Sequence, residues 1–189
     1  AKTVRGTANR TTAITSETHS VLAETCNDLI KLNFRKTGAV TPGTVSFTTT
    51  LLACCSRVRE LTAIPDLRGV FDSCVRWSDT VELPAEGRVF IVGTGLSYCM
   101  AMYGAAKIYE VLGWKSQCQT TEQFSHMELF SLDEGDGVLL IPDSKEDRKM
   151  AQLESLLSGG GWNVAKVGPI DGDEIVHSIQ TAMHLQVLV

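Results

Sequence analysis

RVFIVGTGLS, residues 88–97, is the stretch that decides the fold of this chain. Its unbroken apolar run is typical of a strand buried on both faces of a parallel sheet, and the glycines after it allow a sharp turn into a helix predicted over 97–112. Further strands are predicted over 115–121, 138–142 and 162–168, and further helices over 145–158 and 173–189. Strand and helix alternate, so we predict an α/β fold with a doubly wound parallel sheet flanked by helices.

The segment before residue 65 repeats this theme with fewer elements. The elements predicted there are strands over 10–15 and 28–32 and helices over 17–26 and 46–64. Pro65 interrupts the long helix, and another helix follows it and ends before Pro84. We therefore interpret the first part of the chain as the tail of a module that resembles the second.

The composition argues against several classes of function. Lys and Arg number 17 against 22 Asp and Glu, which gives a net charge of −5, and no basic run suits a phosphate backbone. The six cysteines and four histidines lack metal-ligand spacing, so we expect no metal and cysteines that are reduced and packed. No apolar run is long enough to span a bilayer and no leader pattern opens the chain. We expect a cytoplasmic protein that binds neither nucleic acid nor membrane.

The turn GTGLS offers a candidate binding site. Its residues Gly93, Thr94, Gly95 and Ser97 connect a buried strand to the free N–H groups of a helix N-terminus, an arrangement that can hold a phosphate. The same turn is also common as a packing device. It is not a dinucleotide fingerprint, because Tyr98 stands where the third glycine belongs.

Three further residues are candidates for acid–base chemistry. Lys107 and Glu110 lie three apart on one helix face, which is compatible with a solvated ion pair or with a working base. His126 follows sixteen residues later, after a predicted strand. Glu110 and His126 should therefore lie near opposite edges of the sheet, so that a second module or subunit must bring them together if they act on one molecule.

At these residues the chain resembles a known family. The stretch 87–142 is similar to the second module of sugar isomerase (SIS) domain proteins, which include the isomerase half of glucosamine-6-phosphate synthase and the fructosamine-6-phosphate deglycases. The family pattern is a Gly-rich turn, a helix that ends in K-x-x-E, a strand, and then E-x-x-H-G-P. Here K-x-x-E is Lys107 to Glu110, and the spacing to His126 fits without a gap.

The resemblance implies an organisation and roles for residues. Residues 1–64 would be the closing part of a first SIS module, 65–84 a linker helix, and 85–189 the second module, in the middle of a two-SIS protein. Glu110 would move a proton between C1 and C2 of an open-chain sugar phosphate. Lys107 would act as a positioning residue. His126 would help to open the sugar ring and would come from the neighbouring subunit of a homodimer. No cofactor is implied.

The chain departs from the family pattern at several positions. Gln123 replaces the glutamate of E-x-x-H, with a carboxylate displaced to Glu122, and Met127 and Glu128 replace the Gly-Pro that follows the histidine. Gly43-Thr44-Val45 stands where the family has Ser-Thr-Lys beside the sugar. The family's first-module phosphate loop is missing from the sequence. Thr44 and Gln123 remain candidate substrate contacts, together with the turn at 93–97.

Two hypotheses follow from these observations. The first is a phosphosugar isomerase or fructosamine-phosphate deglycase that works by general acid–base proton transfer. The second is a module that binds a sugar phosphate without turning it over, as a sensor. Glu110 and His126 favour the enzyme, whereas the altered residues around 44 and 127 favour the sensor.

Overall fold

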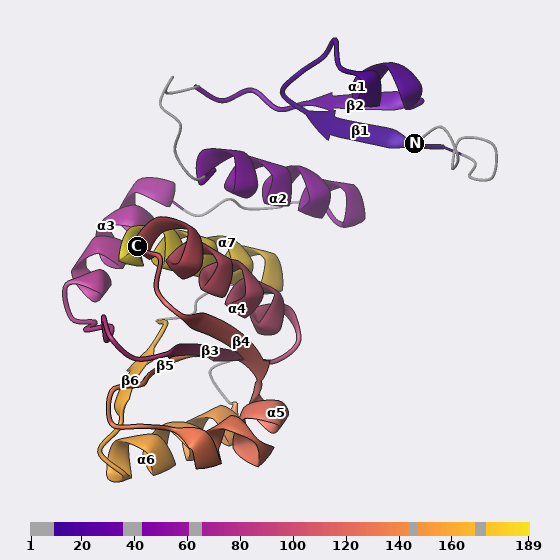
Figure 1. Cartoon of the computed structure of the whole chain (residues 1–189). Coiled ribbons are helices and arrows are strands. Elements are labelled where there is room, and N and C mark those ends of the chain that lie inside the picture. The colour runs from indigo at the N-terminus through magenta and orange to yellow at the C-terminus, as the bar shows by residue number, and fades with distance from the viewer. Residues whose placement is uncertain (1–9, 36–42, 61–65, 144–146, 169–172) are drawn as a thin grey trace. The chain divides into compact units, whose positions relative to one another are not determined.

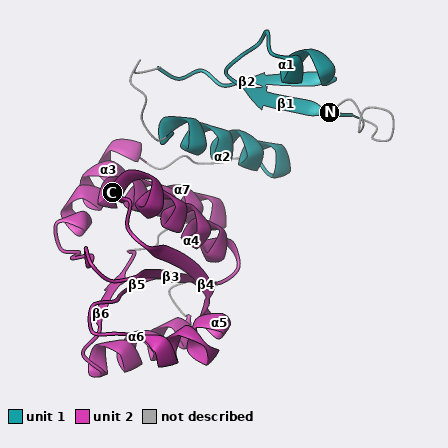
Figure 2. Cartoon of the chain, in the orientation of Figure 1, with its two compact units in different colours: residues 1–63 teal, residues 64–189 magenta. Residues whose placement is uncertain are grey.

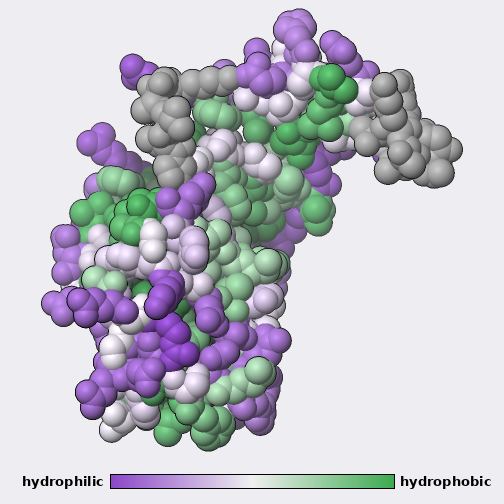
Figure 3. Space-filling model, in the orientation of Figure 1, coloured by the Kyte–Doolittle hydropathy of each residue, from purple (hydrophilic) through white to green (hydrophobic). Residues whose placement is uncertain are grey.

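The computed structural model describes residues 10–35, 43–60, 66–143, 147–168 and 173–189 (Figure 1). The chain divides into two compact units, residues 1–63 and 64–189 (Figure 2). Among the described residues, no helix combines the length and the apolar character needed to cross a membrane. On the side of the molecule drawn in Figure 3, hydrophilic and hydrophobic residues are interspersed over the second unit.

The described residues of the first unit form two parallel strands and two helices. Its elements are β1 (Thr12–Thr15), α1 (Val21–Thr25), β2 (Asp28–Lys31) and α2 (Val45–Val58). Ser20 caps α1, because its hydroxyl accepts a hydrogen bond from the N–H of Ala23. The helix predicted over 46–64 ends at Val58, and residues 61–65 lie outside the described part of the chain.

The second unit is built on a parallel sheet with the strand order β4-β3-β5-β6. Its strands are β3 (Val89–Gly93), β4 (Ser116–Thr120), β5 (Gly137–Ile141) and β6 (Asn163–Lys166). Its longer helices are α3 (Leu67–Ser78), α4 (Leu96–Lys107), α6 (Arg148–Gly159) and α7 (Glu174–Leu188). Helices α3, α4 and α7 cover one face and α5 and α6 the other, which is the predicted doubly wound arrangement (Figure 1).

The segment between β4 and β5 contains two short helices. These are α5 (Thr121–His126) and a 3₁₀ turn (Glu128–Ser131). Thr120 and Gln123 form a capping box, in which each side chain hydrogen-bonds the backbone N–H of the other residue. The T-x-x-Q spacing was readable in the sequence, but it lacked a long apolar run behind it.

The core lies on both faces of β3 and β5, whose ten residues are all buried. On the α6 face the buried side chains are Phe90, Val92, Phe124, Val138, Leu140, Met150, Leu153 and Leu157. The rings of Phe90 and Phe124 meet edge to face with 5.7 Å between centroids, which fixes α5 against the sheet. The apolar run around 88–93 therefore forms the centre of the unit, as the sequence predicts.

The acidic turn before β5 holds a buried ion pair. The Asp136 carboxylate, 3% exposed, accepts hydrogen bonds from the Arg88 backbone N–H (2.8 Å) and from Arg88 Nε (3.1 Å to Oδ2). Burial alone raises the pKa of Asp136, but the bonds from Arg88 and from the Asp133 backbone N–H outweigh it and hold the pKa below 3.8. This pair joins the residues that immediately precede β3 and β5.

We expect Asp136→Ala to lower the free energy of unfolding by about 2–4 kcal/mol, because it leaves the Arg88 guanidinium and a backbone N–H without their buried acceptor. Urea denaturation followed by circular dichroism measures the change. Asp133→Ala is the matched control, since that side chain is 87% exposed and its ion pair with Arg88 is peripheral. Equal stabilities of the two variants would contradict this role of Asp136.

Candidate active site

The candidate acid–base residues form two clusters at opposite ends of β4. Lys107 and Glu110 lie at the end of α4, just before the chain enters β4, and His126 lies on α5, which starts where β4 ends. A strand of five residues separates the two ends by ~17 Å. The geometry within one copy of the chain thus matches the expectation that Glu110 and His126 do not meet.

Glu110 lies in a helical turn of unusual geometry. The helix predicted over 97–112 is α-helical only to Lys107 and continues as a π-helical turn over Ile108–Leu112. Gly113 ends this turn in the left-handed conformation (φ 68°). Single π-turns within α-helices are rare and occur frequently at functional sites.

The ion pair of Lys107 and Glu110 joins a buried cation to an exposed carboxylate. Lys107 Nζ donates to Glu110 Oε2 at 2.6 Å, and the side chains are 5% and 52% exposed, respectively. A buried ammonium needs compensation, and here it comes from Glu110 and from the ring of Tyr103, whose centroid is 5.7 Å from Nζ. The pair is therefore not the solvated surface pair that its spacing alone allowed. Its carboxylate remains open to a small molecule.

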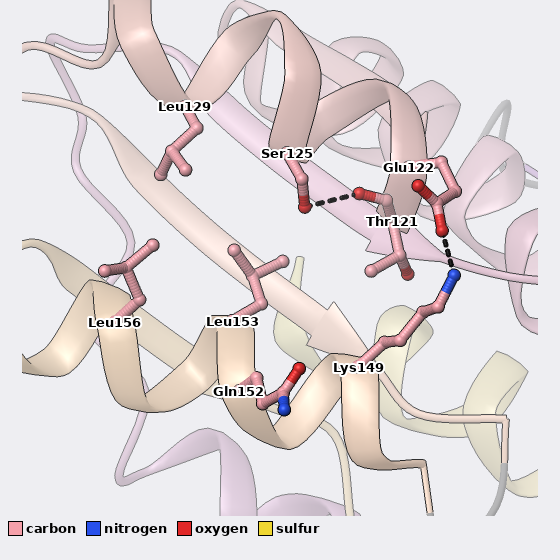
Figure 4. Close-up of a pocket in the computed structure, with 8 residues that line it drawn as sticks. All are labelled: Thr121, Glu122, Ser125, Leu129, Lys149, Gln152, Leu153 and Leu156. Carbon is pink, nitrogen blue, oxygen red and sulfur yellow. Dashed lines mark hydrogen bonds and ion pairs between the residues drawn. The ribbon is translucent and has the colours of Figure 1, made fainter.

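His126 belongs to a surface cluster between α5 and α6. Its Nε2 lies 3.5 Å from Glu122 Oε2, one turn earlier on α5. Figure 4 shows Lys149 reaching from α6 to the same carboxylate. The hydrogen bond and charge of Lys149 lower the pKa of Glu122, and His126 contributes a smaller effect in the same direction. Glu122 thus contacts the histidine from four residues before it, although the family's carboxylate stands at three.

A groove of about 360 Å³ opens beside this cluster (Figure 4). Glu122 and Lys149 border one part of it, and Leu129, Leu153 and Leu156 line the rest. His126 does not line the groove. Its side chain is 78% exposed on the surface of α5, where a second molecule can reach it.

The Gly-rich turn after β3 is tied into the protein by its own hydrogen bonds. Ser97 is fully buried, and its Oγ lies 3.1 Å from the Pro142 carbonyl oxygen and 3.2 Å from His177 Nε2. Gly95 adopts φ 58°, and a Cβ there would stand 3.3 Å from Asp143 Oδ2. A carboxylate of the protein itself therefore lies against the turn at which the sequence allowed a phosphate. Contacts of Ser97 and Gly95 with a substrate stay predictions.

The remaining predicted contacts belong to different elements of the structure. Thr94 is exposed, and its hydroxyl is 2.8 Å from that of Thr121, which joins the ends of β3 and β4. Gly93 is buried as the last residue of β3, and Gln123 is engaged in the capping box of α5. Thr44 is the N-cap residue of α2 in the first unit. Among the described residues, no group of His, Cys, Asp and Glu side chains could hold a metal ion.

The SIS domain family matches residues 82–161, which span β3 through α6. Residues 82–161 are a SIS domain. The match includes Lys107, Glu110 and His126.

Solved structures share the fold over nearly the whole chain. Glucosamine-6-phosphate deaminase from Thermotoga maritima is 19% identical with a TM-score of 0.76, over 95% of this chain and 60% of its own. The C-terminal domain of glucosamine-fructose-6-phosphate aminotransferase from Francisella tularensis is 15% identical with a TM-score of 0.67, over 95% and 61%. Tagatose-6-phosphate ketose/aldose isomerase from Escherichia coli is 14% identical with a TM-score of 0.66, over 94% and 58%.

This chain spans about three fifths of the length of those three structures. At such identities the likeness shows a common SIS-type fold. A comparison with curated protein sequences finds no match.

Two buried histidines of α7 make the stability of the second unit sensitive to mild acid. Burial lowers the pKa of His177 below 6.5 despite the opposing charge of Asp143, and burial likewise lowers the pKa of His184. The unfolded chain therefore binds protons that the folded chain does not. We predict that the free energy of unfolding falls as the pH drops below about 6.5, and that it does not fall further once the folded histidines are protonated.

Urea denaturation at a series of pH values between about 7.5 and 5 measures this dependence. His177→Gln combined with His184→Gln should flatten it, whereas His19→Gln, at an exposed position of the first unit, should leave it unchanged. A wild-type stability that is constant across this range would show that the histidines are not held neutral by burial.

Proposed function

We propose that this chain is part of an enzyme that acts on sugar phosphates, either as an aldose–ketose isomerase or as a fructosamine-phosphate deglycase. The observation that carries the proposal is the Lys107–Glu110 pair, in which a buried ammonium holds an exposed carboxylate in a π-turn of a SIS domain. Support comes from the solved structures of similar fold, which are named as a deaminase, an aminotransferase domain and an isomerase of sugar phosphates.

In the proposed reaction Glu110 is the base. Its carboxylate removes the proton from C2 of the open-chain aldose phosphate while the carbonyl oxygen at C1 gains a proton, which gives an enediol. Glu110 then returns its proton to C1 while the hydroxyl at C2 loses its proton, which gives the ketose. Lys107 donates its hydrogen bond to one oxygen of Glu110 and keeps the other free for the proton. The exposure of the Glu110 side chain leaves room for the substrate carbon to approach.

His126 is proposed to open the sugar ring on a second copy of the chain. The length of β4 separates it from Glu110 within one copy, and its side chain is exposed. A homodimer that places α5 of one protomer beside the end of α4 of the other would complete the site. In this arrangement Glu122 accepts the hydrogen bond of a protonated His126.

Substrate contacts are proposed at the carboxyl ends of the strands, where open α/β sheets bind ligands. Gly93, Thr94, Gly95 and Gln123 lie at this edge, and Thr94 presents a hydroxyl that is exposed and already ordered by Thr121. Ser97 and Thr44 are the remaining candidates, from the interior of the turn and from the first unit.

The alternative is a sensor that binds a sugar phosphate without reaction. It is favoured by the backbone after His126, where Met127 and Glu128 enter a 3₁₀ turn in place of the Gly-Pro of the family pattern. The sensor is also favoured by the surface cluster in which His126 and Lys149 both pair with Glu122. A histidine that already has a partner within its own chain is less available to bind a substrate.

Proton exchange at C2 decides between these functions. We expect glucosamine 6-phosphate incubated with the protein in deuterated water to exchange its C2 hydrogen, as seen by NMR. Fructose 6-phosphate, whose C2 is the carbonyl carbon, should exchange a hydrogen at C1. Glu110→Gln should reduce the rate at least 100-fold, because an amide cannot accept the proton. Glu86→Gln is the matched control, at an exposed position near the start of β3.

A saturable shift of protein resonances by the same sugars, without exchange, would support the sensor. Exchange that persists in Glu110→Gln would remove Glu110 from the role of base.

A further inference from the structure

Tyr103 lies one helical turn before Lys107 and connects it to a different helix. Its hydroxyl accepts a hydrogen bond from Gln186 Nε2 of α7 at 2.9 Å. Its ring lies below the Lys107 ammonium at 5.7 Å, within the distance at which a cation is attracted by an aromatic face. An ordered chain of contacts thus leads from Gln186 through Tyr103 and Lys107 to Glu110.

The ring of Tyr103 stands where water would otherwise solvate the ammonium. Lys107 is 4% exposed, and Glu110 Oε2 is its hydrogen-bond acceptor at 2.6 Å. Without the aromatic face, the lysine side chain would be stabilised by rotating toward solvent, where water hydrates its ammonium. Glu110 would then lose the hydrogen-bond donor that orients its carboxylate. The ring therefore contributes to the geometry of the base without touching the reacting carbon.

Gly104 explains why α7 can reach Tyr103. A Cβ at this position would stand 2.9 Å from Leu185 Cδ2 and 3.0 Å from Ile91 Cδ1, so any larger residue would require these side chains to shift, whereas glycine lets α7 pack on α4 without such a shift. Gln186 follows Leu185 directly and is thereby held against the Tyr103 hydroxyl. The distance between α4 and α7 sets the orientation of the tyrosine.

We propose that Tyr103, anchored by Gln186, is a positioning residue that holds Lys107 in place and through it orients Glu110. This inference rests on the proposed function of Glu110 as the base. It adds two residues that a K-x-x-E spacing does not contain, one of them from a helix outside the 82–161 match. It also makes the packing of α7 a determinant of activity.

The kinetic test compares two substitutions of Tyr103. Tyr103→Leu removes the ring and should lower kcat for C2 exchange about tenfold with KM within twofold, because substrate contacts are unchanged. Tyr103→Phe keeps the ring, loses only the hydrogen bond, and should lower kcat about threefold. Tyr109→Phe is the control, since Tyr109 lies in the same π-turn but is 64% exposed.

A double-mutant cycle covers the case in which Tyr103→Leu does not fold. Gln186→Leu should match Tyr103→Phe, and the double variant should be no slower than either, because both remove the same hydrogen bond. Independent, additive effects would overturn the link between Gln186 and Tyr103. A Tyr103→Leu variant that folds and has the wild-type kcat would overturn the positioning role while leaving Glu110 as the base.

A second measurement does not depend on activity. Burial raises the pKa of Tyr103, the bond from Gln186 opposes this, and the charge of Glu110 raises it further. Titration of ¹³Cζ-labelled tyrosine, assigned with Tyr103→Phe, should therefore show a lower pKa of Tyr103 in Glu110→Gln and a higher one in Gln186→Leu.

If the wild type exchanges no substrate proton, the proposed function fails, and this titration still decides the contacts. A pKa of Tyr103 that is the same in wild type and Glu110→Gln would overturn the coupling itself.

Discussion

The burial of β3 on both faces is the constraint on which the second unit depends. Parallel strands cannot be joined by tight turns, so each connection crosses the sheet as a helix, and a strand buried on both sides needs helices on both. In the order β4-β3-β5-β6 all strands are parallel, but β4 is added on one side of β3 and β5 and β6 on the other, so the direction in which strands are added reverses between β3 and β5. The Gly-rich turn and Asp143 meet at this reversal, and the ends of α4 and the start of α5 fall at opposite ends of β4.

The proposed acid–base chemistry lies where the fold buries a charged group, the Lys107 ammonium, at a cost in free energy. An ammonium of Lys107 that is almost entirely buried requires a carboxylate and an aromatic face, and the structure supplies Glu110 and Tyr103 within one and a half turns of helix. The π-turn moves Glu110 out of the ideal α-helical position and leaves its carboxylate exposed. By contrast, the surface cluster around His126 requires no such compensation, because all of its members are hydrated.

The sequence predicts most of the fold, because the evidence for it is local. Apolar runs at 89–92 and 138–141 mark the two central strands, and the glycines at 159–161 mark the end of α6. The π-turn after Lys107 was not predicted, because a single π-turn within an α-helix is too short to change the apolar pattern along the sequence. Likewise, the bond between Gln186 of α7 and the Tyr103 hydroxyl joins residues 83 apart in the chain, and no local pattern reports such a contact. Glu122 beside His126 was readable as a pair four residues apart.

We propose that Glu110 of one protomer and His126 of another form one site. A mixing experiment tests this proposal most directly. Glu110→Gln and His126→Asn are each expected to lose C2 exchange on a cyclic sugar phosphate. Co-expressed in equal amounts, half of the dimers would pair the two variants and carry one intact site of two, so about a quarter of the wild-type rate should return. A mixed sample as inactive as its two components would contradict the shared site.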